Sequence, residues 1–338
     1  MFPTHPARRT VLRGLAAIAG GSALAAGRSA AAADSQPVTF ITPYGNSVAY
    51  APDYVAAAGG LFARQGLAVR IVGGTGSTSA IQQVVAGQAL IGRTGGIDVV
   101  KAVAAAKAPI RAIGTIAHSS VFVLISAEAA AITAPAQLAG KTVGIVSAGG
   151  GTEDYLNIML ARAGVPKDSV KRQVVGNSPG AFDLVKLKRI DAFICDDSVV
   201  VNLRARQAPI AVMPIGPFAS VPGQVYIASE QGIAEHHDAL LGYLRAVRAA
   251  VGQIVADTDG TETLKLLEPY HLPDMRDQQL GWATIRAAEQ EWDARGAADR
   301  IAIIPDDWTK GWQEMVQAGL VPAGDPTRAY TTEFTKSL

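Results

Sequence analysis

Short apolar runs rich in β-branched residues alternate with segments of helical periodicity along the first part of the chain. Val38–Thr42, Ala68–Val72 and Ala89–Gly92 have the length and composition of strands. The stretches between them, Ala49–Ala58 and Ser79–Ala86, carry apolar residues at three- and four-residue intervals and predict helices. The pattern therefore predicts a βαβαβ unit.

The same arrangement returns further along the chain. Thr142–Val146, Val170–Val175 and Ala192–Cys195 predict strands, and Thr152–Ala163 and Ala181–Lys188 predict helices. Alternating strands and helices indicate mainly parallel sheets, which bind ligands at the carboxyl ends of their strands. Two such α/β units would face each other across a cleft.

Two extended stretches separate these units, Thr115–Ser126 and Gly216–Ser229, and both are interpreted as crossings between lobes. The segment from Glu230 onward is mostly helical in pattern. We therefore expect lobe 1 to comprise residues 34–122 and 221–338, with the C-terminal helices, and lobe 2 to comprise 123–220. One continuous doubly wound domain is the alternative, and it would need no crossings.

The N-terminus has the features of an export signal. Arg8 and Arg9 precede a weakly apolar stretch, Leu15–Ala26, and small residues follow at Ala31 and Ala33. The arginine pair resembles a twin-arginine signal, and the apolar stretch is too short to span a bilayer. We expect residues 1–33 to be the signal, cleaved near Ala33, and the protein to be soluble in the periplasm.

Cysteine content and charge narrow the function further. Cys195 is the only cysteine, so the chain has no intrachain disulfide and no lipid-bearing cysteine at the cleavage site. Four arginines leave with the signal, and the formal net charge falls from +1 to −3. The remainder has no lysine or arginine run and few aromatic residues, which argues against nucleic acid as a partner. No further long apolar run predicts membrane insertion.

The stretch "VSAGGGTEDYLNIML", Val146–Leu160, is an apolar strand end, three glycines and a helix start. It lacks the Gly-Lys-Ser/Thr of a Walker loop, because Gly151 is followed by Thr152 and Glu153. It also lacks the third glycine of the dinucleotide fingerprint, because the sixth place is Asp154. The glycines still let a ligand approach the backbone closely, at the N-terminus of the predicted helix.

Several motifs together resemble the sulfonate, nitrate and thiamine-precursor (SsuA/THI5-like) group of substrate-binding proteins of ABC importers. They are "AYAPDYVAAAGGLFARQGLAVRIV", "GSTSAIQQVVAGQALIG", "PAQLAGKTVGIVSAGGGTEDYLNIMLARAGV" and "KRIDAFICDDS", in family order between Val38 and Ser229. The resemblance implies an α/β type II periplasmic binding protein fold and a small-molecule ligand trapped by hinge closure. It also implies transporter permease and ATPase subunits as partners, a monomeric state and no cofactor or metal.

Carried over position by position, the resemblance places seven candidate ligand contacts on the first lobe and its crossing. They are Tyr44, Asn46, Ser77, Thr78, Thr94, Gly95 and His118. Turn formation and helix capping explain Asn46 and Ser77 equally well. His118 is a secondary candidate, because a lone histidine is more often structural.

Eight candidates lie on the second lobe: Gly149, Gly150, Gly151, Thr152, Asn177, Ser178, Asp196 and Asp197. For Glu153 and Asp154 we favour a role in offsetting the positive end of a helix. Asp196 or Asp197 could accept a hydrogen bond from a ligand amine or hydroxyl, and a helix cap is the alternative. Unpaired carboxylates would repel a small anion, which favours a larger organic molecule with donor groups over nitrate.

Two other classes of function remain as alternatives. Thiamine-pyrimidine synthases related to this group depend on a cysteine-rich motif that Cys195 alone does not reproduce. The histidines show no H-E-x-x-H spacing, and the chain has no G-x-S-x-G elbow. A periplasmic ligand sensor is the other alternative, and it would need a separate signalling partner.

Overall fold

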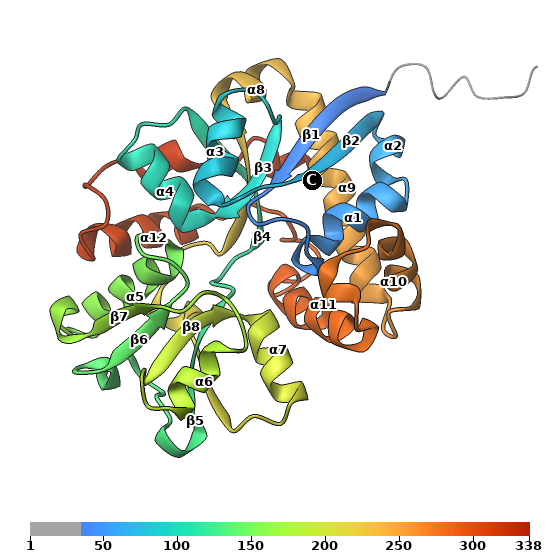
Figure 1. The fold of residues 1–338 in the computed structure, drawn as a ribbon. Helices are drawn as coiled ribbons and strands as arrows, with labels where there is room; N and C mark the ends of the chain where they lie inside the picture. Colours follow the sequence, from blue (N-terminus) through green and yellow to red (C-terminus); the bar gives the residue numbers. More distant parts are fainter. Residues whose placement is uncertain (1–34) are drawn as a thin grey trace, which may run out of the picture. The chain divides into compact units, whose positions relative to one another are not determined.

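The computed structural model describes residues 35–338. The predicted export signal, with its arginine pair and cleavage position near Ala33, lies outside the described residues. The described part contains two five-stranded sheets with helices packed around both (Figure 1).

The first sheet has the strand order β2-β1-β3-β10-β4. Its strands are β1 (Gln36–Thr42), β2 (Leu67–Gly73), β3 (Ile91–Gly95), β4 (Ile110–Ala117) and β10 (Gln224–Ser229). The second sheet has the order β7-β6-β8-β5-β9. Its strands are β5 (Phe122–Ala127), β6 (Thr142–Ile145), β7 (Lys171–Val174), β8 (Ala192–Asp196) and β9 (Ile210–Pro214). The six strands expected from apolar runs are all present, with no end shifted by more than three residues.

Strand direction agrees with the expectation of mainly parallel sheets, with one strand of opposite direction in each sheet. β1 runs parallel to β2 and β3, and β6 runs parallel to β7 and β8. However, β10 is antiparallel to both β3 and β4, and β5 is antiparallel to both β8 and β9. β5 and β10 run against the other strands because each follows a crossing segment, so no helix returns the chain to the same end of the sheet.

Helices surround both sheets. In the first part of the chain they are α1 (Ala51–Ala58), α2 (Leu61–Arg64), α3 (Ser77–Val85), α4 (Gly96–Ala104), α5 (Gly151–Arg162), α6 (Ala181–Lys186) and α7 (Asp197–Ala205). The C-terminal part adds α8 (Glu230–Glu235), α9 (His237–Ala256), α10 (Thr261–Leu267), α11 (Gln278–Trp292) and α12 (Pro305–Gln317). This agrees with the helical pattern predicted after Glu230.

α9 is the one helix of residues 35–338 that is long and apolar enough to cross a membrane. Its apolar face is used inside the protein. Leu240, Tyr243, Leu244 and Val247 are fully buried in a core cluster with β1 and α1. A smaller cluster, built by β5, β8, α6 and α7, fills one side of the second sheet.

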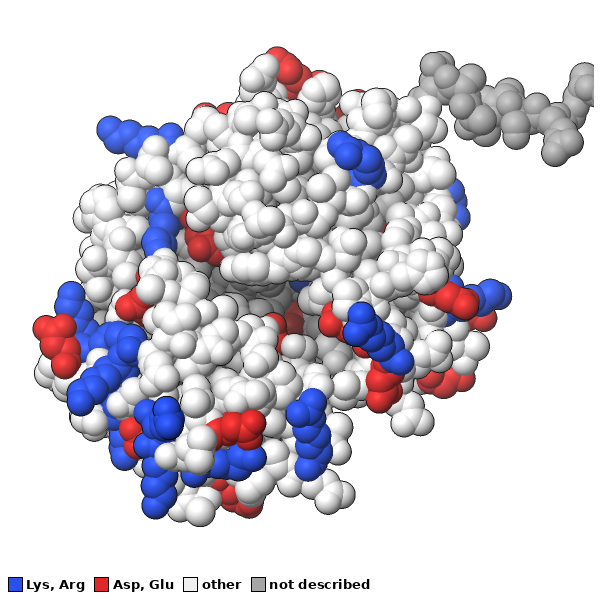
Figure 2. All heavy atoms as spheres, viewed as in Figure 1, with Lys and Arg blue, Asp and Glu red and all other residues white. Residues whose placement is uncertain are grey.

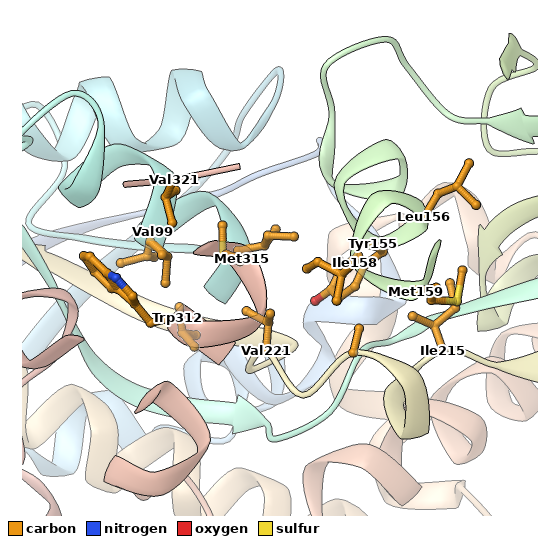
Figure 3. Packing of buried hydrophobic residues seen from close by; sticks show 14 of the residues in the cluster. Val99, Tyr155, Leu156, Ile158, Met159, Ile215, Val221, Trp312, Met315 and Val321 are labelled. Carbon is orange, nitrogen blue, oxygen red and sulfur yellow. The ribbon is translucent and has the colours of Figure 1, made fainter. Parts of the chain in front are cut away.

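A third apolar cluster, which we call the shared core, continues from one sheet to the other. It contains Val99 and Val100 of α4, Leu156 and Met159 of α5, and apolar residues of β5 and β6. Trp312 and Met315 of α12 and Val221 belong to the same cluster (Figure 3). The shared core is continuous across positions 122 and 220, so the expected lobe boundaries there stay a prediction.

The segments between the sheets are shorter than the expected crossings. Most of Thr115–Ser126 belongs to β4 and β5, which leaves only His118–Val121 between them. On the return, residues 219–223 precede β10. The backbone N–H of Gly223 donates to the carbonyl oxygen of Ala117 at 2.9 Å, so the two segments touch.

Gly223→Ala tests this contact. An added Cβ would lie 1.7 Å from the backbone oxygen of Ser119, so one segment has to move. We expect a loss of at least about 2 kcal/mol in the free energy of unfolding, measured by urea titration.

Gly252→Ala is the matched control. Gly252 lies inside α9, and its added Cβ would approach only a terminal nitrogen of Arg300, at 3.1 Å. Because alanine favours helices over glycine, we expect unchanged or slightly higher stability, by up to about 1 kcal/mol. Equal effects of the two substitutions would contradict the close approach of the segments.

Candidate functional site

A cavity of about 420 Å³ is lined by residues from both sheets and from the C-terminal helices. Figure 2 shows this face of the molecule hollowed near its middle, with carboxylate side chains visible in and around the hollow. From the first sheet and its loops come Tyr44, Ser47, Ala49, Tyr50, Ser77, Arg93, Gly95, Ile97 and Asp98. From the second come Val146, Ser147, Gly151, Thr152, Tyr155, Asn177, Asp196, Asp197 and Ser198. The crossings and C-terminal helices add Val121, Phe122, Gly223, Gln224, Asp274, Thr284, Ala288 and Trp292.

Strand ends explain why these residues meet. β1, β3, β6 and β8 end at Thr42, Gly95, Ile145 and Asp196, and the lining loops and helix starts follow directly. The carboxyl ends of parallel strands lie at one edge of a sheet, where side chains and helix N-termini are free of the ladder. The local pattern of strand, loop and helix start therefore builds both walls.

A buried ionic network lies behind the first-sheet wall. Nη1 of Arg93 lies 3.7 Å from Oδ2 of Asp53 and donates to the carbonyl oxygen of Ala49 at 3.0 Å. The hydroxyls of Tyr226 and Tyr243 donate to Asp53 at 3.0 and 2.6 Å. Burial raises the pKa of Asp53 to about 6, against the opposing effects of Arg93 and the two tyrosines. Arg93 is thus charge-balanced within the protein.

Two carboxylates of the second-sheet wall are neighbours with different surroundings. Asp196 caps α7, accepting from the backbone N–H of Ser198 at 3.1 Å, and also accepts from Nδ2 of Asn177 at 2.7 Å. Within residues 35–338, no group donates a hydrogen bond to the side chain of Asp197. Burial, with the nearby charges of Glu291 and Asp196, raises the pKa of Asp197 to about 7.

Ion pairs join α5 to α4 and to α12. Nζ of Lys101, on α4, lies 2.6 Å from Oδ2 of Asp154, on α5. Arg162, also on α5, lies 2.7 Å from Glu314 on α12. Asp154 therefore contacts a cation on α4, in addition to its expected place in the first turn of α5.

Eight of the fifteen residues predicted from the sequence line the cavity. They are Tyr44, Ser77, Gly95, Gly151, Thr152, Asn177, Asp196 and Asp197. Their contact with a ligand stays a prediction. Thr152 also has a structural role, because its hydroxyl accepts from the backbone N–H of Val146 at 3.0 Å.

The other seven predicted residues are outside the lining of the cavity: Asn46, Thr78, Thr94, His118, Gly149, Gly150 and Ser178. Asn46 accepts from the hydroxyl of Tyr54 at 3.0 Å, and His118 lies 3.4 Å from Asp307. Thr94 is fully buried, whereas Thr78 and Ser178 are exposed. In the glycine loop, Gly149 has a φ of +70°, whereas Gly150 has an ordinary φ of −89°.

Sequence reasoning missed several lining residues. Arg93 could have been identified, because it is a cation inside an apolar strand. The sequence around Tyr50, Phe122 and Tyr155 predicts ordinary aromatic core residues. Asp274, Thr284 and Trp292 come from the C-terminal region, whose helical pattern is generic. Their placement depends on how α11 packs against α7.

The raised pKa of Asp197 generates a prediction for Asp197→Asn. An aspartate has a pKa of about 3.9 when unfolded, so the folded state binds the extra proton between about pH 4 and 7. Stability is therefore lost as pH rises through this window. We expect the stability gain of Asp197→Asn over the wild type to be about 1 kcal/mol larger at pH 8 than at pH 5, allowing for solvent screening.

Chemical denaturation at both pH values measures this difference. Asp168→Asn removes the same charge at an exposed position and should follow the wild type at each pH. If the Asp197→Asn and wild-type curves stay parallel from pH 5 to 8, Asp197 does not titrate in this range.

The fold is shared with solved structures of low sequence identity. A protein of Bordetella bronchiseptica RB50 is 21% identical with a TM-score of 0.66, covering 90% of this chain and 97% of that one. The periplasmic aliphatic sulphonate binding protein SsuA of Escherichia coli is 16% identical with a TM-score of 0.66, covering 88% and 92%. The desulfurization enzyme DSZB is 15% identical with a TM-score of 0.58, covering 89% and 98%.

These likenesses show the fold, and it is the type II periplasmic binding protein fold that the sequence resemblance implied. No curated protein matches the chain. A family model described as NMT1/THI5 like matches residues 47–260, which is more than half of the sequence. The chain belongs to the NMT1/THI5-like family.

Proposed function

We propose that the mature chain is the soluble solute-binding component of an ABC-type importer. It would capture a small organic molecule, of sulfonate-, pyrimidine- or aromatic-acid-like type, by hinge closure. The observation that carries this proposal is the cavity itself. Its volume of about 420 Å³ suits a small organic compound, and its walls come from both sheets. A ligand that contacts both walls stabilises the closed form over an open one.

The packing on either side of the cavity suggests which side opens. On the side of α4, α5 and α12, the shared core is continuous between the sheets. On the side of α7 and α11, the helices touch, but their buried residues belong to two different clusters. Separating α7 from α11 would expose less apolar surface, so we infer that the cavity opens there (Figure 1).

The surroundings of Cys195 support binding over catalysis by a thiol. The side chain is fully buried in the cluster around β8, and burial raises its pKa well above the ordinary range. A catalytic cysteine needs a thiolate in an accessible position. The likeness to DSZB is one of fold, at 15% identity, and carries no residue of its chemistry to this chain.

Partners and location follow from the same proposal. The closed form would be recognised by permease and ATPase subunits of the transporter, and export through a twin-arginine-type signal would place the monomer in the periplasm. The E. coli relative by fold is named a periplasmic binding protein, which is consistent with this location.

Native mass spectrometry of protein purified from the periplasm tests the proposal. We expect one small compound per chain, released unchanged on denaturation. Its removal should increase the radius of gyration in solution scattering, because the walls separate. Conversion of the compound by purified protein, or an absence of any bound compound after exposure to periplasmic extract, would contradict solute capture.

Gly150→Val then tests the second-sheet wall against the compound so identified. An added Cβ would lie 2.3 Å from the hydroxyl oxygen of Ser147, which lines the cavity, so Ser147 has to move. We expect affinity to fall about ten-fold or more, by calorimetry, with a small effect on melting temperature. Gly149→Ala is the control: it strains a residue at positive φ, away from the cavity lining, and should lower stability while leaving affinity unchanged.

A further inference from the structure

The charge of the cavity wall is strongly one-sided. Four carboxyl side chains line it, Asp98, Asp196, Asp197 and Asp274, against the single guanidinium of Arg93. In a partly enclosed site these charges are weakly screened, so they decide which ligands can enter.

Arg93 does not provide a free positive charge for an anion. Its guanidinium lies 3.7 Å from the carboxylate of Asp53, and both side chains are almost wholly buried. It is also stacked over the ring of Tyr50, 5.1 Å from the centroid. The unpartnered Nε of Arg93 can still donate one hydrogen bond, but the pair as a whole is neutral.

Two of the other carboxyl groups have hydrogen-bond donors, and the third has polar neighbours. Asp196 accepts from Ser198 and Asn177, and Asp274 accepts from the backbone N–H of Val48 at 3.1 Å. Burial raises the pKa of Asp98 to about 6, against the opposing effects of the Ser77 hydroxyl and the Gly95 backbone.

Asp197 differs from all three. Among residues 35–338 it has no hydrogen-bond donor and no ion-pair partner, although it lines the cavity. The charged groups around it are Glu291 on α11, Asp196 at the end of β8 and Arg204 on α7. Glu291 is fixed in place by the hydroxyl of Ser119, which donates to it at 2.6 Å. The negative charges of Glu291 and Asp196 disfavour the ionised form of Asp197, and a bound cation would relieve this repulsion.

Aromatic rings complete the surroundings. Tyr44, Tyr50, Phe122, Tyr155 and Trp292 line the same cavity. Ring faces attract cations and pack well against flat apolar bodies. The two features favour the same kind of ligand.

We propose that the cavity selects an organic cation, a protonated amine or amidine on an aromatic or similarly apolar body, with its nitrogen bound by Asp197 and further favoured by the nearby charge of Glu291. This inference rests on the proposed function and narrows its ligand class. Organic acids and sulfonates are disfavoured, because they would place a second negative charge beside Asp197.

Three probes with one benzyl body test the charge preference: benzylamine, benzyl alcohol and phenylacetate. At pH 8 the amine is protonated and the wall carboxylates are ionised. We expect benzylamine to bind wild-type protein about ten-fold or more tighter than phenylacetate, with benzyl alcohol between them, in calorimetric titrations.

Two variants that each remove one negative charge distinguish an effect of the charge at Asp197 from an effect of the net charge of the protein. Asp197→Asn should reduce the preference for benzylamine about ten-fold, whereas Asp168→Asn, on the exposed surface, should leave it unchanged. Glu291→Gln should act in the same direction as Asp197→Asn. This second variant keeps the test valid if one substitution perturbs the fold.

Proton release on binding distinguishes a charge interaction from a fit of shape, because shape complementarity alone releases no proton. Because the pKa of Asp197 is raised to about 7 in the free protein, a bound cation lowers it and expels a proton near neutral pH. Calorimetry of benzylamine binding at pH 7, in buffers of different ionisation enthalpy, should show this release in the wild type and not in Asp197→Asn.

Tighter binding of phenylacetate than benzylamine would overturn the inference and leave solute capture intact. Equal effects of Asp197→Asn and Asp168→Asn, or binding of none of the three probes, would also overturn it. Failure of the proposed function is seen separately, as chemical conversion of the bound compound or as no compound bound from periplasmic extract.

Discussion

The shared core is the constraint on which the rest of this structure depends. Apolar residues of α4, α5 and α12 pack into one continuous cluster that belongs to both sheets. The sheets are therefore held together along one side. The two short segments between the sheets also touch, where the backbone N–H of Gly223 donates to the carbonyl oxygen of Ala117. A cavity bounded by both sheets follows directly, because the loops after β1, β3, β6 and β8 must then face one another. Opening on that side would expose a large apolar surface, whereas α7 and α11 bury their apolar residues in separate clusters.

Electrostatics inside the cavity are a second consequence of this enclosure. Carboxylates removed from water become weaker acids unless a donor or cation compensates them. Asp53 has two tyrosine donors and Arg93, and Asp154 has Lys101. Asp197 has no such partner among the described residues, so its burial is left uncompensated. In a solute-binding protein, a bound ligand can supply the hydrogen-bond donor or cation that such a carboxylate lacks.

Local sequence patterns predicted the parts of the fold that depend on local physics. The six expected strands and the helices between them exist because apolar periodicity and glycine-containing turns specify them residue by residue. The same reasoning placed the loops after the strands, so Asn177, Asp196 and Asp197 could be named as candidates. It could not give the antiparallel direction of β5 and β10, which depends on the path of the chain between sheets.

Long-range packing explains the other misses. Trp292 and Asp274 reach the cavity only because α11 and its preceding turn pack beside α7, a contact between segments far apart in the sequence. His118 was a candidate by its place on a crossing, but Asp307 and the carbonyl oxygen of Asp299 occupy its ring nitrogens. The sequence around His118 contains no pattern that predicts a contact with Asp307 or Asp299.

Distance measurements between pairs of spin labels test directly whether the cavity opens between α7 and α11. Cys195 is fully buried, so labels can be directed to introduced cysteines at exposed positions: Ala205 with Gln290 across α7 and α11, and Ala161 with Gln313 across α5 and α12. We expect removal of the bound compound to lengthen the first distance and to leave the second unchanged. A change confined to the second pair, or no change in either, would contradict a cavity that opens between α7 and α11.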